Sequence, residues 1–285
     1  IYRCIITTRK AFQKGYLKTQ ATPGAIELID WNPNNFSELK DAIKNSDIVI
    51  NLIGILYETR KQKFNQVHAH FPYLLSDLCN QMGVSKLVHV SALGVKEGHI
   101  AKYMQSKLEG EKNIQKNFKS SIILRPSLIF GPEDKFFNTF AFISQFSPAL
   151  PLIGGGKNKF SPIYVDDVAK AIVEVIKLNN SDIKIYELGG PENYTFKELM
   201  EILLNNIKKK RLLIPIPFSW AKFQSYFMQM MPKPLLTPDQ VEMLKYHCIV
   251  TGNYPDLKKL GISGKKIQDI LPKYIYRFRA GGQFG

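Results

Sequence analysis

Short apolar runs alternate with longer amphipathic stretches along the first half of the chain. The apolar runs predict β-strands at residues 5–8, 25–30, 47–53, 86–91 and 121–124, and the amphipathic stretches predict helices at 36–44, 65–82 and 101–117. Strands that are apolar throughout, with helices between them, are typical of a parallel sheet that is covered on both faces. The pattern therefore predicts an α/β fold with a doubly wound parallel sheet of the Rossmann type.

The pattern becomes less regular in the second half. We predict a nucleotide-binding core at residues 1–135 and a smaller mixed lobe at 136–285, with some strands and helices of this lobe returning to the core. The stretch 195–209 predicts a helix, because Thr195 and Glu198 have the spacing of a capping box at its start.

A glycine-rich loop that binds phosphate should follow the first strand of a Rossmann unit, and none follows residues 5–8. GGGK at 154–157 lies late in the chain and lacks the first glycine and the Ser/Thr of a P-loop, so we interpret it as a turn. We therefore expect residues 5–8 to be the second strand of the sheet. The first strand and its glycine loop would then precede Ile1.

Three strand ends carry residues that suit a dinucleotide. Arg9 ends the strand at 5–8, where a basic side chain can pair with the 2′-phosphate of NADP; an ordinary basic surface is the alternative. Asp30 and Trp31 end the next strand, where an adenine edge would lie. NLIG at 51–54 ends the strand after that, and its glycine lets a cofactor approach the backbone closely.

Tyr103 and Lys107 lie four residues apart in a predicted helix, so their side chains share a face. A lysine ammonium beside a phenol favours the phenolate and lowers the pKa of the tyrosine. Such a tyrosine can exchange a proton with a carbonyl while NADPH transfers hydride. The same spacing occurs by chance in many amphipathic helices. Because this helix follows a predicted parallel strand that ends in Ser91, we favour a functional Tyr–Lys pair.

Several motifs follow one another in a characteristic order. They are NLIG at 51–54, HVSALG at 89–94, YMQSKLEGE at 103–111, ILRPSLIFGPED at 123–134 and PIYVDDVAKAI at 162–172. In this order the chain resembles an extended or atypical short-chain dehydrogenase/reductase, and more closely the 39-kDa (NDUFA-nine type) accessory subunit family of respiratory complex I. IDWN at 29–32, FGPEDKFFN at 130–138 and the closing YRFRAGGQFG extend the resemblance across nearly the whole chain.

The resemblance implies a tightly held NADPH in a Rossmann domain that docks on the peripheral arm of complex I, near the membrane. It places the adenosine phosphate at Arg9 and the adenine at Asp30 and Trp31. The other residues that it places around the cofactor are Leu52, Ile53 and Gly54 along its length, Ser91, Tyr103 and Lys107 at the nicotinamide ribose, and Pro126, Ser127 and Leu128 beside the nicotinamide.

One position departs from the catalytic members of that superfamily, which often carry paired serines with the second one active. Here the second position is Ala92, and Ser91 precedes it. A shift of one residue turns a side chain to the opposite face of a strand. Loss of one hydrogen-bond donor to the substrate oxyanion slows a reaction of this kind roughly a hundredfold or more. We therefore expect the nucleotide to be structural, with little or no turnover; an active form would use Ser91, Tyr103 and Lys107.

The formal net charge of +15 indicates a negative partner. The basic residues are spread along the chain and accompany no nucleic-acid motif, so we favour a membrane surface or an acidic assembly over nucleic acid. The apolar, aromatic stretch at 215–238 either packs within the lobe or faces a membrane or partner. No apolar run reaches the roughly 18 residues of a membrane span. The cysteines and histidines lack metal-ligand spacing, so we expect no metal site.

We predict an NADPH-binding accessory subunit of complex I with a structural, assembly or regulatory role. Its partners would be other complex I subunits. It would lie on the matrix side of the mitochondrial inner membrane, or on the cytoplasmic face of a bacterial inner membrane. The alternatives are a free NADP-dependent reductase, epimerase or dehydratase that uses Tyr103 and Lys107, and a basic binding module for RNA or lipid.

Overall fold

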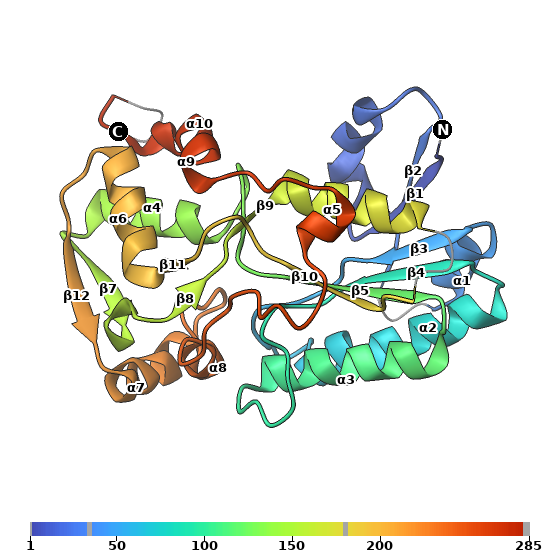
Figure 1. Cartoon of the computed structure of the whole chain (residues 1–285), viewed down its shortest axis with the longest axis horizontal. Coiled ribbons are helices and arrows are strands. Elements are labelled where there is room, and N and C mark those ends of the chain that lie inside the picture. The colour runs from blue at the N-terminus through green and yellow to red at the C-terminus, as the bar shows by residue number, and fades with distance from the viewer. Residues whose placement is uncertain (1, 33–35, 179–181, 282–285) are drawn as a thin grey trace.

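The computed structural model describes residues 2–32, 36–178 and 182–281, so the last four residues of the YRFRAGGQFG motif lie outside it. The described chain forms two lobes that lie side by side (Figure 1). The first lobe holds a parallel sheet in the spatial order β10-β5-β4-β3. Its strands are β3 (Ile48–Asn51), β4 (Lys86–Val90), β5 (Ser121–Pro126) and β10 (Ile185–Leu188). A second parallel pair in this lobe consists of β1 (Cys4–Thr8) and β2 (Ile26–Asp30).

Helices cover both faces of the four-stranded sheet, as the alternation of apolar and amphipathic stretches predicts. Leu87 of β4 points into a cluster formed with helices α1 (Phe36–Lys44), α2 (Phe71–Gln81) and α3 (Lys102–Asn117). The next residue, Val88, points into a cluster on the other face that includes α5 (Val165–Lys177). Successive side chains of a strand point to opposite faces, so both faces of β4 are buried and the doubly wound α/β prediction is confirmed.

The second lobe has its own hydrophobic core. Its helices are α4 (Phe136–Phe146), α6 (Phe196–Ile207), α7 (Phe218–Met228), α8 (Pro238–Met243), α9 (Ile267–Ile270) and α10 (Pro272–Ile275). A parallel pair of strands, β7 (Ala149–Ile153) and β12 (Leu212–Ile216), borders this core. The predicted capping box is present at the start of α6, where the Thr195 hydroxyl accepts a hydrogen bond from the Glu198 amide.

Three elements of the second half of the described chain return to the first lobe. Strand β10 pairs with β5, and α5 packs against β4 and β5. The short helix η4 (Leu257–Leu260) adds Leu257 to the same cluster. A boundary at residue 135 therefore stays a prediction, since the chain crosses between the lobes more than once.

Several short elements differ in part from the sequence predictions. The predicted helix at 65–82 begins as a π-helix, η2 (Asn65–His70), before it continues as α2. An unpredicted 3-10 helix, η1 (Ala11–Gln20), joins β1 to β2. GGGK forms a turn, as expected, around η3 (Gly154–Gly156), where the backbone is left-handed; a Cβ on Gly154 would lie 2.2 Å from the Phe218 ring.

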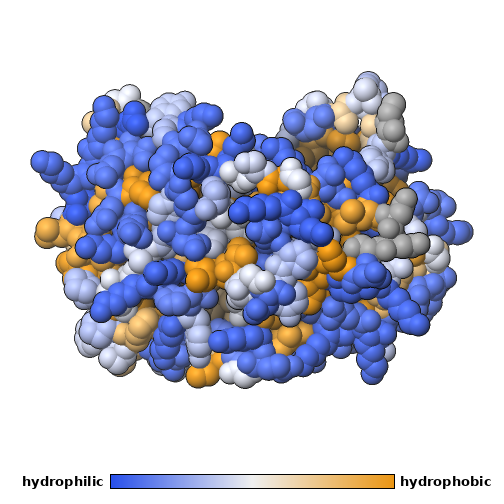
Figure 2. Space-filling model, in the orientation of Figure 1, coloured by the Kyte–Doolittle hydropathy of each residue, from blue (hydrophilic) through white to orange (hydrophobic). Residues whose placement is uncertain are grey.

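The remaining pairings are two residues long: β6 (Ile129–Phe130) with β9 (Ile163–Tyr164), and β8 (Lys159–Phe160) with β11 (Tyr194–Thr195). Figure 2 shows that hydrophilic side chains cover most of one face, with exposed apolar side chains between them. Among the described residues, every helix is too short or too polar to cross a bilayer.

Candidate functional site

The predicted cofactor residues of the first lobe gather at one edge of the sheet. Strands β3, β4 and β5 are parallel. Asn51 at the end of β3 pairs with His89 of β4, and Val90 at the end of β4 pairs with Leu124 of β5. Their carboxyl ends therefore meet at the same edge, where ligands of open α/β sheets bind. The loop after β3, Ser91 after β4 and the residues after β5 all begin at this edge.

The loop Leu52–Gly54 presents apolar side chains to its surroundings. Leu52 is 65% exposed and Ile53 is 37% exposed, although both directly follow a sheet strand. The Asn51 side chain fixes the loop by accepting a hydrogen bond from the Ile53 amide at 3.0 Å. Exposed apolar groups at a strand end provide a surface on which a flat or apolar ligand can lie.

Lys107 reaches this loop from α3. Its side chain is buried, and its ammonium donates a hydrogen bond to the Val90 carbonyl at 3.2 Å. A Cβ placed on Gly54 would lie 3.4 Å from the Lys107 Nζ, at ordinary van der Waals distance, so the loop and the ammonium are direct neighbours. Burial lowers the pKa of Lys107 to about 8. An ammonium has three donors, and a ribose diol at this edge would supply acceptors for the others.

Tyr103 shares the Lys107 face of α3, as the spacing predicts, but its phenol is not activated. Burial raises its pKa above the ordinary value, and Cys248 contributes in the same direction. The ring packs edge-on against Phe64 and His68, and Met243 of α8 packs against the same cluster. Desolvation of the phenolate therefore outweighs the expected stabilisation by the lysine.

Ser91 and Ala92 lie on different sides of the chain after β4. Ala92 packs against the cluster that contains Tyr103. Ser91 is 5% exposed, and its hydroxyl has no hydrogen-bond partner among the described residues. The side chain that faces Tyr103 is thus a methyl group, which cannot donate a hydrogen bond to a substrate oxygen.

The adenine side of the predicted site is formed by β1 and β2. Arg9 is exposed and forms no ion pair with a described residue. Lys10 adopts a left-handed backbone, and its amide donates to the Asp30 carboxylate at 2.9 Å. The Trp31 ring is buried 5.5 Å from the Phe71 ring. The exposed side chains of Arg9 and Asp30 can therefore contact a ligand, whereas the indole of Trp31 is packed in the hydrophobic core.

A groove separates β1 from β3. Among the described residues, β1 pairs with β2 alone and β3 pairs with β4 alone, so each of the two strands has one edge without a partner strand. Ile5 and Thr7 line one side of the groove, and Ile48 and Ile50 line the other.

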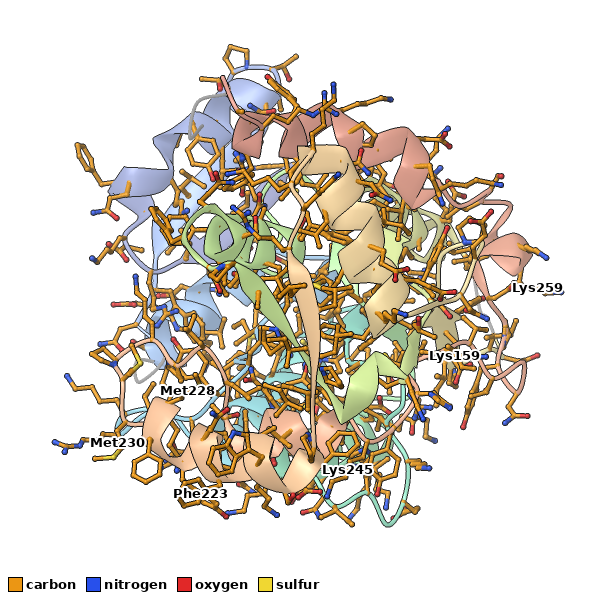
Figure 3. The ribbon with its side chains drawn as sticks, turned by 90° about the vertical axis from the view of Figure 1, so that its left-hand side faces the viewer. Lys159, Phe223, Met228, Met230, Lys245 and Lys259 are labelled. Carbon is orange, nitrogen blue, oxygen red and sulfur yellow. The ribbon has the colours of Figure 1, made fainter. Side chains whose placement is uncertain are left out.

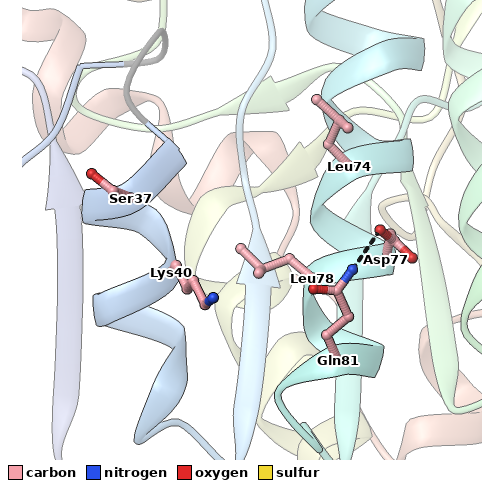
Figure 4. A pocket seen from close by; sticks show the side chains of 6 residues that line it. All are labelled: Ser37, Lys40, Leu74, Asp77, Leu78 and Gln81. Atoms are coloured by element: carbon pink, nitrogen blue, oxygen red, sulfur yellow. Dashed lines mark hydrogen bonds between the residues drawn. The ribbon is translucent and has the colours of Figure 1, made fainter.

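A second groove lies away from this edge, between α1 and α2. Figure 4 shows Ser37 and Lys40 on one helix, and Leu78 pointing from the other helix toward them. Asp77 and Gln81 are hydrogen-bonded to each other at 2.9 Å. This groove contains none of the predicted cofactor residues.

Two buried histidines at the cofactor edge were not predicted from the sequence to belong to the site. His89 is fully buried, and its Nδ1 lies 3.1 Å from the Asn51 amide nitrogen. His68 lies beneath the loop, 3.0 Å from the Ile55 amide. The available signal was a histidine within an otherwise apolar stretch, VHVS for His89 and VHA for His68.

The comparisons with known proteins identify the family. The family model described as "NAD dependent epimerase/dehydratase family" matches residues 2–189. The chain belongs to this family. Subunit 9 of the mitochondrial NADH dehydrogenase [ubiquinone] 1 alpha subcomplex from Arabidopsis thaliana is 30% identical over 278 residues, which are 94% of this chain and 69% of the relative. The mouse protein of the same name is 30% identical over 92% of this chain and 68% of its own length.

A fungal relative matches almost the whole chain. The 40 kDa subunit of the mitochondrial NADH-ubiquinone oxidoreductase of Neurospora crassa is 24% identical over 98% of this chain and 74% of its own length. The resemblance to the complex I accessory subunits is thereby confirmed as homology. This member of the epimerase/dehydratase family is thus related over most of its length to subunits of a respiratory complex.

Solved structures of the epimerase/dehydratase family share the fold. UDP-glucuronic acid 4-epimerase from Bacillus cereus, in complex with NAD, has a TM-score of 0.69 at 16% identity and covers 96% of this chain and 91% of its own. The dTDP-glucose 4,6-dehydratase DesIV from Streptomyces venezuelae, with NAD bound, has a TM-score of 0.71 at 16% identity, with coverage of 97% and 87%. The fold is therefore that of NAD(P)-binding Rossmann proteins.

Proposed function

We propose that this chain is an NADPH-binding accessory subunit of respiratory complex I, with a structural, assembly or regulatory role and little or no turnover. The observation that carries the second part is the pairing of a cofactor-competent Lys107 with a buried Tyr103 that faces Ala92. The sequence relationship to complex I subunits supports the first part. A site that keeps its cofactor contacts but loses its oxyanion donor favours binding over chemistry.

The residues at the sheet edge fit a dinucleotide. Lys107 has donors to spare for ribose hydroxyls, and the buried Ser91 hydroxyl lacks a partner among the described residues. Leu52 and Ile53 offer apolar contact. Arg9 offers an exposed guanidinium that forms no ion pair in the described chain, which suits the 2′-phosphate of NADP. NADPH bound here would supply a hydride-donating nicotinamide, while the protein supplies binding and orientation.

Bound NADPH would stabilise the first lobe. It would bind the native state alone, and a ligand of that kind raises stability by mass action. We propose that Pro126–Leu128 flank the nicotinamide, since the Ser127 hydroxyl is already held by the Cys248 carbonyl at 2.7 Å and fixes the backbone there. The Cys248 segment therefore lies directly against the residues that we place beside the nicotinamide.

We further propose that residues 215–238 face the membrane surface beside complex I. Trp220, Phe223, Phe227 and Met230 are each at least half exposed on or just after α7. Figure 3 shows Phe223, Met228 and Met230 along the same end of the second lobe. Aromatic side chains of this kind favour the headgroup level of a bilayer. The protein would then lie on the matrix side of the mitochondrial inner membrane, or on the cytoplasmic face in a bacterium.

Isolation of the native protein from mildly solubilised membranes tests the proposal. We expect complex I subunits to be recovered with it in stoichiometric amounts, and NADPH to be released from the purified protein on acid-free denaturation. Recovery of the protein without any complex I subunit would overturn the partner assignment. Recovery without a nicotinamide nucleotide would overturn the cofactor assignment.

The free reductase, epimerase or dehydratase is the second candidate, because Tyr103 and Lys107 share one face of α3. Turnover of sugar nucleotides and small carbonyl compounds with NADPH separates the two candidates. A reaction that is lost in Tyr103→Phe would establish the enzyme. We expect no such reaction, because Tyr103 is only 8% exposed and Ala92 offers no hydrogen bond.

A further inference from the structure

A π-helix brings His68 to the cofactor edge. The wide turn η2 precedes α2 and packs against α3 at Gly110, where a Cβ would lie 1.9 Å from the His68 carbonyl oxygen. Only glycine permits this approach. The His68 side chain is 1% exposed, and it lies between α3 and the loop that follows β3. π-helical turns of this kind are frequent at functional sites.

The two ring nitrogens of His68 connect these two elements. The Ile55 amide donates to Nε2 at 3.0 Å, and Nδ1 lies 3.0 Å from the Ser106 hydroxyl. That hydroxyl donates to the Tyr103 carbonyl at 2.8 Å, so Nδ1 must carry the proton and donate to Ser106. One neutral tautomer of His68 therefore satisfies all of these hydrogen bonds. Together they form a chain that leads from the loop through the imidazole to the first turn of α3.

Aromatic contacts fix the plane of the imidazole. The Phe64 ring stacks on it with centroids 5.5 Å apart, and the Tyr103 ring meets it edge-on at 5.2 Å. A Cβ on Gly54 would lie 3.6 Å from the His68 Nε2 and 3.4 Å from the Lys107 Nζ. The imidazole and the ammonium thus both lie next to Gly54 of the loop.

We propose that His68 is a positioning residue for the nucleotide: its hydrogen bonds fix the position of the loop 52–55 relative to Tyr103 and Lys107. The affinity for the nucleotide then depends on these two hydrogen bonds. This inference rests on the proposed NADPH site and assigns a role to a residue outside the Tyr–Lys pair. Without the imidazole, the Ile55 amide has no acceptor, and the loop can leave the position in which its backbone meets the cofactor.

NADPH titration of the purified full-length protein tests the role of His68, with the fluorescence of the bound nicotinamide as the signal. His68→Leu removes both hydrogen bonds, and we expect NADPH affinity to fall about tenfold or more, the equivalent of one unpaired buried amide. His68→Gln keeps an acceptor and a donor, so we expect affinity within about threefold of the parent. Rescue by glutamine separates hydrogen bonding from packing.

Two control variants separate positioning from general stability. His70→Leu changes an exposed histidine on the same segment and should leave affinity unchanged. Val175→Ala removes a buried side chain of α5, far from the loop, and should lower the melting temperature without changing NADPH affinity. Should His68→Leu fail to fold, Ser106→Ala takes its place, because it removes the partner of Nδ1 and should weaken NADPH binding about fivefold, beyond the margin set for His68→Gln.

The outcomes are distinguishable from failure of the proposed function. If the parent protein binds no NADPH, the cofactor assignment itself is wrong. If the parent binds NADPH and His68→Leu binds it equally well, the site stands and His68 has no positioning role. Equal loss in His68→Leu and His68→Gln would also overturn the proposal, because ring packing rather than hydrogen bonding would then decide affinity.

Discussion

The Arg125 guanidinium lies against the Glu111 carboxylate inside the protein, with Nε 3.0 Å from Oε1 and Nη2 2.5 Å from Oε2. Glu111 belongs to α3 and Arg125 to β5, so the pair ties the helix of Tyr103 and Lys107 to the sheet. Tyr254 packs over the guanidinium at 5.0 Å. The two side chains are only 2% and 7% exposed, which makes each charge dependent on the other.

Removal of one partner of this pair should be far more costly than removal of both. Arg125→Met leaves a buried carboxylate unpaired, and we expect the free energy of unfolding to fall by about 3–5 kcal/mol in urea titrations. The double variant Glu111→Met, Arg125→Met should recover most of this loss. Lys112→Ala is the matched control, because Lys112 of the same helix pairs with Glu97 on the surface and should cost less than about 1 kcal/mol.

Lys86 closes the end of another helix. Its ammonium donates to the carbonyls of Val175 at 3.1 Å, Ile176 at 2.6 Å and Leu178 at 2.5 Å, at the C-terminal end of α5, where carbonyls lie beyond the reach of the helix's own amides. We expect Lys86→Met to lower the free energy of unfolding by about 1–3 kcal/mol, and to increase hydrogen exchange in the last turn of α5. Lys116→Met, an exposed change at the end of α3, should have no measurable effect. An equal loss in both variants would contradict this role.

His68 should make the protein less stable in acid. Burial, with Lys107 as a further cause, lowers the pKa of His68 from 6.5 to about 3. Below pH 6.5 the His68 imidazole is protonated in the unfolded chain but stays neutral in the native state. The free energy of unfolding therefore falls as pH falls toward 3. Between pH 7 and pH 4 we expect a loss of roughly 3 kcal/mol that is absent from His68→Gln. His70→Gln should retain the loss in denaturant titrations at each pH.

Lys107 should make the protein more stable in alkali, with the same sign of pH dependence as His68. Burial lowers its pKa from 10.5 to about 8, so the native state releases this proton earlier than the unfolded chain does. The unfolded state binds more protons between pH 8 and 10.5, and stability from this group therefore rises with pH across that window. We expect a gain of roughly 3 kcal/mol that Lys107→Met lacks. A parallel pH profile for parent and variant would show that Lys107 titrates normally.

The sequence was sufficient for the sheet and for the places that most of the proposed site residues occupy in it, because both follow from local pattern. Apolar runs fixed which segments become strands, and the parallel order of strands then places Leu52–Gly54, Ser91 and Pro126–Leu128 at one edge. The i, i+4 spacing placed Tyr103 and Lys107 on one face. These relations need no knowledge of how distant segments pack.

Properties that depend on packing between distant segments were not predictable in this way. The pKa of Tyr103 rises rather than falls, because Phe64 and Met243, from elements far apart in the sequence, bury it. Trp31 ends a strand where adenine was expected, yet its ring joins the core beside Phe71. The π-helical turn at His68 depends on the absence of a side chain at Gly110, more than forty residues later.

The exposed face of α7 provides a test that does not depend on the nucleotide. Trp220 and Phe223 stack with ring centroids 5.7 Å apart and are more than half exposed. Lys222 and Lys245 both contact Glu242, at 2.6 and 2.7 Å, so this carboxylate offsets part of the positive charge beside the aromatic face. Partitioning of this face into a bilayer should therefore depend more on its apolar side chains than on charge.

Cosedimentation with lipid vesicles measures this partitioning. We expect the protein to bind vesicles of phosphatidylcholine in which about one lipid in five is anionic cardiolipin. The affinity for these vesicles should fall about tenfold when Trp220 and Phe223 are both changed to serine. The matched control changes Phe142 and Phe146, an exposed aromatic pair on α4, to serine and should leave binding unchanged. If the α7 variant binds vesicles as the parent does but no longer associates with complex I, this face contacts a protein subunit and the proposed membrane contact is wrong.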